Sequence, residues 1–158
     1  MVSFLSLIEK TSEVSFIDEA LLRHNIELTN GNRCDYLMSP QGIIGQSYHA
    51  LYQAFQKGYK KNILLIEYEN LISQPQTELN RIYDFFGMSR FTHQFENVQP
   101  KYEENDTVYR LKDMHRVRNK IQKINRDNSK YLSDYVIDKY NHMEFWRKVA
   151  PRYFIFGV

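Results

Sequence analysis

The rest of the chain is organised around residues Ile63–Leu71, which read ILLIEYENL. The first four residues are a short apolar run, and a run of this length and β-branched content predicts a strand buried on both faces, as in parallel sheets. Open α/β sheets bind ligands at the carboxyl ends of their strands. Four polar residues follow the run at that end: Glu67, Tyr68, Glu69 and Asn70.

A helix is predicted directly after this strand. Ser73 and Gln76 have the spacing of a capping box, and Pro75 lies in the first turn, where its missing N–H costs nothing. Apolar side chains then recur at helical spacing, and Gly87 fits a left-handed helix end. The apolar positions are Leu79, Ile82, Tyr83 and Phe86.

Most of the remaining chain is also expected to be helical. Before the strand, helices are predicted over 1–10, over 15–28 with a cap formed by Ser15 and Asp18, and from Ser39-Pro40 to Gly58, with a turn at 30–32. Gly42 and Gly45 are interpreted as close-packing glycines, because no Gly-Lys-Ser/Thr follows them as a phosphate loop requires. Residues 91–110 are expected to form a polar loop, and a last helix is expected from Asn128 or Ser129 to Trp146.

Length and composition indicate one domain over residues 1–158. A formal net charge of +2 argues against binding of nucleic acid or membrane by bulk charge. Cys34 is the single cysteine and is expected to be a buried free thiol, so no disulfide framework is predicted. No apolar run reaches membrane-spanning length and no signal peptide is evident, so a cytoplasmic location is expected.

A basic segment follows the polar loop. It contains six cations within fifteen positions, together with His115: Lys112, Arg116, Arg118, Lys120, Lys123 and Arg126. One interpretation is a solvated charged strip. The other is an anion site, because the planar guanidinium of arginine matches the geometry of phosphate oxygens.

The order and spacing of these motifs resemble a known family. YEN-L at the strand end, the helix TELNRIYDFFG, the segment FTHQFENV and the HxVR core of the basic segment are similar to the C-terminal portion of sulfotransferases that use 3′-phosphoadenosine 5′-phosphosulfate (PAPS). The likeness is closest to the bacterial and Golgi-type branches. It implies a mainly α fold with one or two short strands, the C-terminal half of a sulfotransferase-like, P-loop-type α/β domain.

The resemblance also implies site residues for PAPS or adenosine 3′,5′-bisphosphate. Tyr68 matches the tyrosine that lies against the adenine, and Ser3 and Arg118 match contacts near the 3′-phosphate, with Lys120 as a further candidate. No catalytic residue is assigned, because nothing in the sequence supports His93 or His115 as the base.

The phosphosulfate-binding loop and the catalytic base of the family belong to a first half that this sequence does not match. A partial domain is therefore expected, one that does not catalyse sulfation without a separately encoded N-terminal half, or else a truncated gene product. The exposed strand edge is expected to be covered by a second copy of the chain or by the apolar segment Tyr153–Val158. The acceptor is not predicted.

Two other functions are compatible with the sequence. One is a non-enzymatic nucleotide-binding or protein-interaction module that keeps the scaffold without the chemistry. The other is a helical nucleic-acid-binding domain that uses the basic segment.

Overall fold

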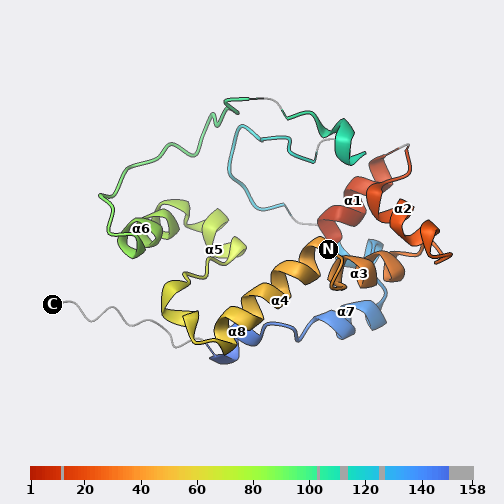
Figure 1. The fold of residues 1–158 in the computed structure, drawn as a ribbon. Coiled ribbons are helices and arrows are strands. Elements are labelled where there is room, and N and C mark those ends of the chain that lie inside the picture. Colours follow the sequence, from red (N-terminus) through yellow and green to blue (C-terminus); the bar gives the residue numbers. More distant parts are fainter. Residues whose placement is uncertain (12, 103, 111–113, 125–126, 150–158) are drawn as a thin grey trace.

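The structure is a computed structural model, and it describes residues 1–11, 13–102, 104–110, 114–124 and 127–149. Helices dominate the described residues (Figure 1). In chain order the elements are α1 (Val2–Lys10), α2 (Phe16–Arg23), α3 (Asn30–Met38), α4 (Ile43–Gln56), η1 (Tyr59–Asn62), α5 (Tyr68–Ser73), α6 (Pro75–Phe85), η2 (Asp106–Tyr109), η3 (Asn128–Lys130), α7 (Asp134–Tyr140) and α8 (Phe145–Val149). None of the described helices has the length and apolar character needed to cross a membrane.

The first three helices are joined by a small core, and the second and third begin at side-chain caps. Ser15 Oγ accepts a hydrogen bond of 3.1 Å from the amide of Asp18, which confirms the predicted cap of α2. Thr29 Oγ1 accepts one of 3.1 Å from the amide of Asn32 and so caps α3. Two clusters of buried apolar side chains lie between these helices: Ile8, Ile17 and Leu37, and Leu5, Cys34 and Val136. The second cluster includes a residue of α7, so the C-terminal part of the chain shares this core.

Cys34 is fully buried and free, as the sequence predicted. Burial raises the pKa of its thiol above the ordinary value, because the thiolate would lose its hydration. The cysteine is therefore a small apolar core residue.

A buried ion pair joins α2 to α3. Arg33 Nε lies 2.7 Å from Asp18 Oδ1, and the two side chains are 18% and 8% exposed. The guanidinium also donates a hydrogen bond of 2.9 Å to Asn30 Oδ1. Both charges have thus left water, and each depends on the other for compensation.

The turn between α3 and α4 brings two backbone segments into close contact. A Cβ atom on Gly42 would clash with the carbonyl oxygen of Tyr36, and one on Gly45 would clash with that of Ser39. Both glycines are buried. Their interpretation as close-packing glycines is confirmed.

The C-terminal helices are tied to the N-terminal ones by aromatic and polar contacts. The ring of Phe145 in α8 lies edge-on to three rings of α4, with centroid distances of 5.3 Å to Tyr48, 5.2 Å to Tyr52 and 5.5 Å to Phe55. Two Lys-Tyr dipeptides each reach one carboxylate: 130–131 bind Glu9, and 139–140 bind Asp35. Burial and the hydrogen bond to Asp35 raise the pKa of Tyr140 to about 12.

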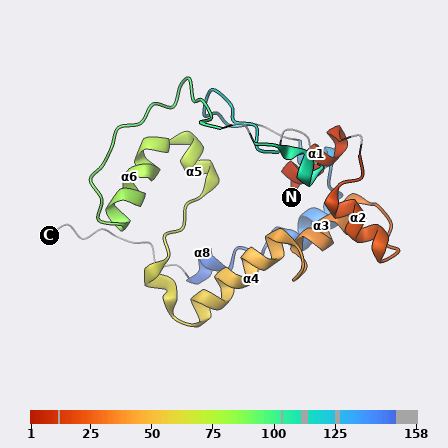
Figure 2. The same ribbon diagram turned by 45° about the horizontal axis from the view of Figure 1, so that its top comes forward.

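The helices that share the buried core, α1–α4 and α7, are called the N-terminal lobe below. Helices α5 and α6 stand apart from it. Figures 1 and 2 both show them on the opposite side of the molecule from α1–α3, and α5 packs chiefly against α6. Among the described residues from 57 to 135, Glu78 is the only buried one, and it pairs with Arg81 at 2.5 Å. The buried apolar core is therefore confined to α1–α4 and α7.

The predicted central strand does not form. Ile63 (φ −123°, ψ 120°) and Glu67 (φ −82°, ψ 131°) have extended backbone, but residues 63–67 belong to no sheet and their side chains are only half-buried. A strand needs a neighbour to satisfy its backbone groups, and the described residues offer none here. The prediction of a strand buried on both faces is therefore wrong.

Several predicted helix boundaries are also wrong, each because a local backbone preference was misjudged. Ser73 ends α5 and does not cap α6; Pro75 does begin α6, as predicted. α2 stops at Arg23, before Asn25 with φ of 54°. The predicted turn at 30–32 begins α3, because Thr29 supplies a cap. The last predicted helix is divided into η3, α7 and α8.

We predict that Arg33→Ala lowers the free energy of unfolding by about 3 kcal/mol, because it leaves the Asp18 carboxylate buried without its cation. Arg23→Ala is the matched control: it removes a guanidinium that also pairs with an acid of α2, at 2.7 Å from Glu19, but is 71% exposed. This control should change the stability by less than about 1 kcal/mol. Urea unfolding followed by circular dichroism measures both, and equal losses would contradict the assignment.

A pair of glycine variants tests the close contact at the α3–α4 turn. Gly45→Ala should destabilise the chain by about 1–3 kcal/mol, because its Cβ meets a backbone oxygen that cannot move independently. A Cβ at Gly31, within α3, would meet Val136 Cγ2 at 3.6 Å and Thr29 Oγ1 at 3.8 Å, both ordinary contacts. The stability of Gly31→Ala should be unchanged or rise by up to about 1 kcal/mol. Thermal unfolding measures the stability of both variants. A Gly45→Ala variant at least as stable as Gly31→Ala would contradict the close contact at this turn.

Candidate functional site

Ser3 lies in the first turn of α1, and its side chain is exposed. The next residue, Phe4, packs against the buried cluster of Ile8, Ile17 and Leu37. Met114, which is distant from α1 in the sequence, packs against the same cluster. The basic segment therefore lies, at Met114, beside the helix that carries Ser3.

The basic segment is held at its other end by a short antiparallel pairing. Glu96 and Lys120 form an isolated bridge, and the flanking bonds run from Val98 N to Asn119 O at 2.8 Å and from Ile121 N to Phe95 O at 3.3 Å. Lys120 Nζ also lies 2.7 Å from Glu96 Oε1. This pairing fixes the backbone immediately after Arg118.

The loop that contains Glu96 is itself bound to α6 by hydrogen bonds. Gln76 donates a hydrogen bond of 2.8 Å to the carbonyl of Phe91 and accepts one of 2.9 Å from the amide of His93. The His93 ring stacks on Tyr83 with an interplanar angle of 7°, and its Nε2 lies 2.6 Å from the Tyr83 hydroxyl. Gln76, which the sequence assigned to a capping box, is thus an anchor for the loop.

A carboxylate fixes the orientation of His115. Its Nδ1 lies 2.6 Å from Asp106 Oδ1, and its amide donates a hydrogen bond of 3.0 Å to Asp106 Oδ2. These bonds, the backbone one first, hold the pKa of Asp106 below its usual value, so the carboxylate is ionised and the imidazole Nδ1 donates. The sequence did not predict this pair, because Asp106 lies nine residues away in a loop without periodicity.

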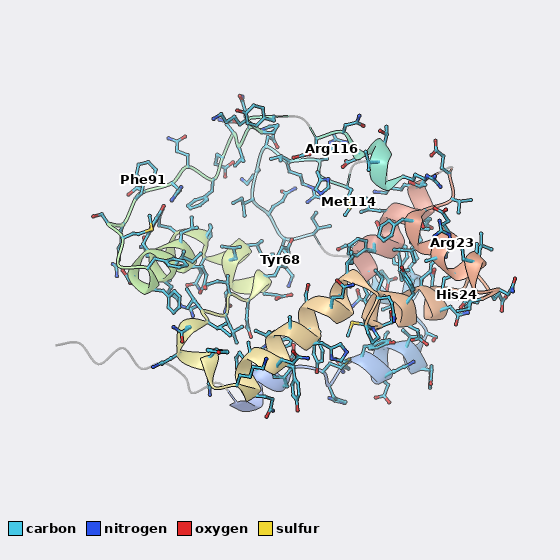
Figure 3. The ribbon with its side chains drawn as sticks, viewed as in Figure 1. Arg23, His24, Tyr68, Phe91, Met114 and Arg116 are labelled. Carbon is cyan, nitrogen blue, oxygen red and sulfur yellow. The ribbon has the colours of Figure 1, made fainter. Side chains whose placement is uncertain are left out.

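Two predicted site residues present side chains that the described contacts leave available. Tyr68 begins α5 and is 58% exposed, and Arg118 is exposed on the basic segment. Within the described part of the chain, neither side chain takes part in a hydrogen bond, ion pair or ring contact. Figure 3 shows Tyr68 near the middle of the molecule and Arg116 and Met114 above it in that view.

The structure therefore joins some predicted site residues and not others. It brings the beginning of the basic segment to the α1 helix of Ser3, and it joins Lys120 to the loop that α6 anchors. No described contact links Tyr68 to Arg118. Of the basic residues singled out from the sequence, Lys112 and Arg126 lie outside the described residues. No cluster of potential metal ligands occurs among the residues that are described.

A cavity of about 550 Å³ lies elsewhere, at the C-terminal end of α2 and along α3. Its lining mixes apolar and polar side chains, among them Leu21, Arg23, His24, Asp35 and Tyr36. Arg23 and His24 lie at the edge of the molecule away from Tyr68 (Figure 3). None of the four predicted site residues lines this cavity.

Comparison with known proteins gives one match. A family model described as "Sulfotransferase domain" matches residues 8–148. Curated proteins and solved structures give no match. The described residues form a mainly helical fold with almost no strand, which is consistent with a portion of such a domain. Because the family match spans most of the sequence, the chain belongs to the sulfotransferase domain family.

Proposed function

We propose that the chain holds the adenosine and 3′-phosphate end of PAPS, with Arg118 and Ser3 at the 3′-phosphate, Lys120 nearby and Tyr68 against the adenine. The family match supports sulfotransferase-type function in general. The observation that carries the finer assignment is the exposed guanidinium of Arg118, which is held by anchored backbone and is engaged by no described acid.

The side-chain groups of Arg118, Lys120 and Ser3 match the chemistry of the ligand. A phosphate needs donors that are not already neutralised, and the guanidinium of Arg118 offers a planar pair of them. Lys120 is a weaker candidate because its ammonium lies 2.7 Å from Glu96. Ser3 adds a hydroxyl donor on a helix that shares packing with Met114, four residues before Arg118.

Tyr68 fits the adenine end. An exposed aromatic ring offers a face on which a base can stack, and such stacking contributes about 1–3 kcal/mol per base. The ring is 58% exposed at the start of α5, directly after the extended segment. In this proposal, nucleotide binding would bring α5 and the basic segment together around one ligand.

Bound PAPS would supply the sulfuryl group that passes to a hydroxyl or amine of an acceptor. Transfer also requires groups that hold the phosphosulfate end and a base that takes the acceptor proton. His93 contacts Tyr83 and His115 contacts Asp106, and neither is assigned as the base. In this proposal the described residues hold the nucleotide and do not by themselves carry out the transfer.

Calorimetry with adenosine 3′,5′-bisphosphate tests the proposal. Arg118→Ala should weaken binding about 10–100-fold, the loss expected for charged hydrogen bonds to phosphate. Tyr68→Ala should weaken it about tenfold through lost stacking. The matched controls are Arg90→Ala, an arginine 61% exposed and paired with Asp84, and Tyr135→Ala, a tyrosine 73% exposed. Both controls should bind like the unaltered chain.

Three results would contradict the proposal. The chain would show no binding of the bisphosphate, or all four variants would bind equally, or binding to any polynucleotide would fall steeply with salt and show no preference for the bisphosphate. The last result would favour the nucleic-acid-binding alternative.

A further inference from the structure

The side-chain amide of Gln76 binds two backbone groups of a segment that is distant in the sequence. Its Nε2 donates a hydrogen bond of 2.8 Å to the carbonyl of Phe91, and its Oε1 accepts one of 2.9 Å from the amide of His93. Nε2 also donates to Asn80 Oδ1 at 3.0 Å, one turn further along α6. The side chain thus bonds residues 91 and 93 as the backbone of a neighbouring strand would, with its own orientation fixed by α6.

Tyr83 holds the same segment at a second point. It lies about two turns along α6 from Gln76, and its hydroxyl is 2.6 Å from His93 Nε2. The rings of Tyr83 and His93 are stacked, and the Phe91 ring lies edge-on to His93 with a centroid distance of 4.9 Å. Of the contacts made by Gln76 and Tyr83, those of Gln76 are the ones made to backbone. Gln76 therefore fixes the path of the chain at 91–93.

The segment that Gln76 holds is also paired with the basic segment. Val98 N donates to Asn119 O at 2.8 Å, and Ile121 N donates to Phe95 O at 3.3 Å. Arg118 directly precedes Asn119. A single residue, Gln94, separates 91–93 from the paired residues 95–98. A displacement of 91–93 therefore moves this pairing, and with it the backbone beside Arg118.

The helix that carries Gln76 also supports the other half of the proposed nucleotide site. α5 packs chiefly against α6, and Tyr68 is the first residue of α5. A chain of described contacts therefore runs from α5 through α6 and the 91–98 loop to the backbone beside Arg118. Gln76 is the link in this chain that joins the helix to the loop backbone.

We propose that Gln76 is a positioning residue for the nucleotide: it holds the 91–98 loop on α6 so that the guanidinium of Arg118 is presented at a fixed place. This inference rests on the proposed function and adds a residue that acts on the ligand only through Arg118. The bond from Gln76 to the Phe91 carbonyl is exposed, so water replaces it when the side chain is removed. Loss of Gln76 therefore loosens the loop without unfolding the helices, and binding must then order the loop at a cost in affinity.

Hydrogen exchange followed by NMR, without any ligand, tests the anchoring. Gln76→Ala should speed exchange of the Val98 and Ile121 amides about tenfold, the factor expected for losing one or two ordinary hydrogen bonds. Gln53→Ala is the matched control, an exposed glutamine of α4 whose side chain enters no hydrogen bond within the described residues. It should leave both rates unchanged, and neither variant should alter exchange in α1–α3.

Two exchange results would overturn the proposal, whether or not the chain binds nucleotide. One is an unchanged rate at Val98 and Ile121 in Gln76→Ala. The other is an equal acceleration throughout α1–α3, because the variant would then act on overall stability and not on the loop.

A double-mutant cycle with adenosine 3′,5′-bisphosphate, measured by calorimetry, tests the positioning. Gln76→Ala alone should weaken binding about three- to tenfold. In the Arg118→Ala background it should change binding by less than about twofold, because the guanidinium that it positions is absent. Losses that simply add in the double variant would refute the positioning role. Absence of bisphosphate binding by the unaltered chain would contradict the proposed function, and the exchange rates would still decide whether Gln76 anchors the basic segment.

Discussion

Among the described residues, burial of apolar side chains is confined to α1–α4 and α7, and the rest of the structure depends on that limit. The fully buried apolar side chains Ile17, Leu21, Cys34 and Leu37 all lie in α2 and α3, and Phe55 is the last described apolar residue that is buried before α7. Burial of apolar side chains contributes about 1.5–3 kcal/mol each, so this lobe supplies most of its own stability. The described residues between 57 and 135 lack that source.

The less buried residues are held mainly by hydrogen bonds. Gln76 and Tyr83 bind the loop of 91–98 to α6, and a short antiparallel pairing joins that loop to the basic segment. Each of these hydrogen bonds is weak, because exposed hydrogen bonds contribute only about 1 kcal/mol. Apolar packing of Met114 against the buried cluster of Ile8 adds one further contact. The proposed nucleotide site therefore lies where the chain is least constrained by packing, as ligand-binding segments often do. A nucleotide that contacts both Arg118 and Tyr68 would add a link between the basic segment and α5.

The sequence predicted the elements whose signals are local. Ser15 with Asp18 identified a true helix cap, Gly87 does adopt φ of 64° at the end of α6, and Gly42 and Gly45 do lie against backbone. It failed where distant contacts decide the outcome. Gln76 bonds to a loop fifteen residues away, and the apolar run at 63–66 reads as buried although the described chain supplies no neighbouring strand. The pairing of His115 with Asp106 carries no periodic signal at all.

The predicted cover for the strand, residues Tyr153–Val158, lies outside the described residues. Hydrogen exchange measured by mass spectrometry tests the confinement of burial most directly. Amides of α1–α3 should be strongly protected, because these helices surround the buried core. Amides of 64–66, which donate to no described backbone acceptor, should exchange rapidly. Protection of 64–66 equal to that of α1–α3 would contradict the account.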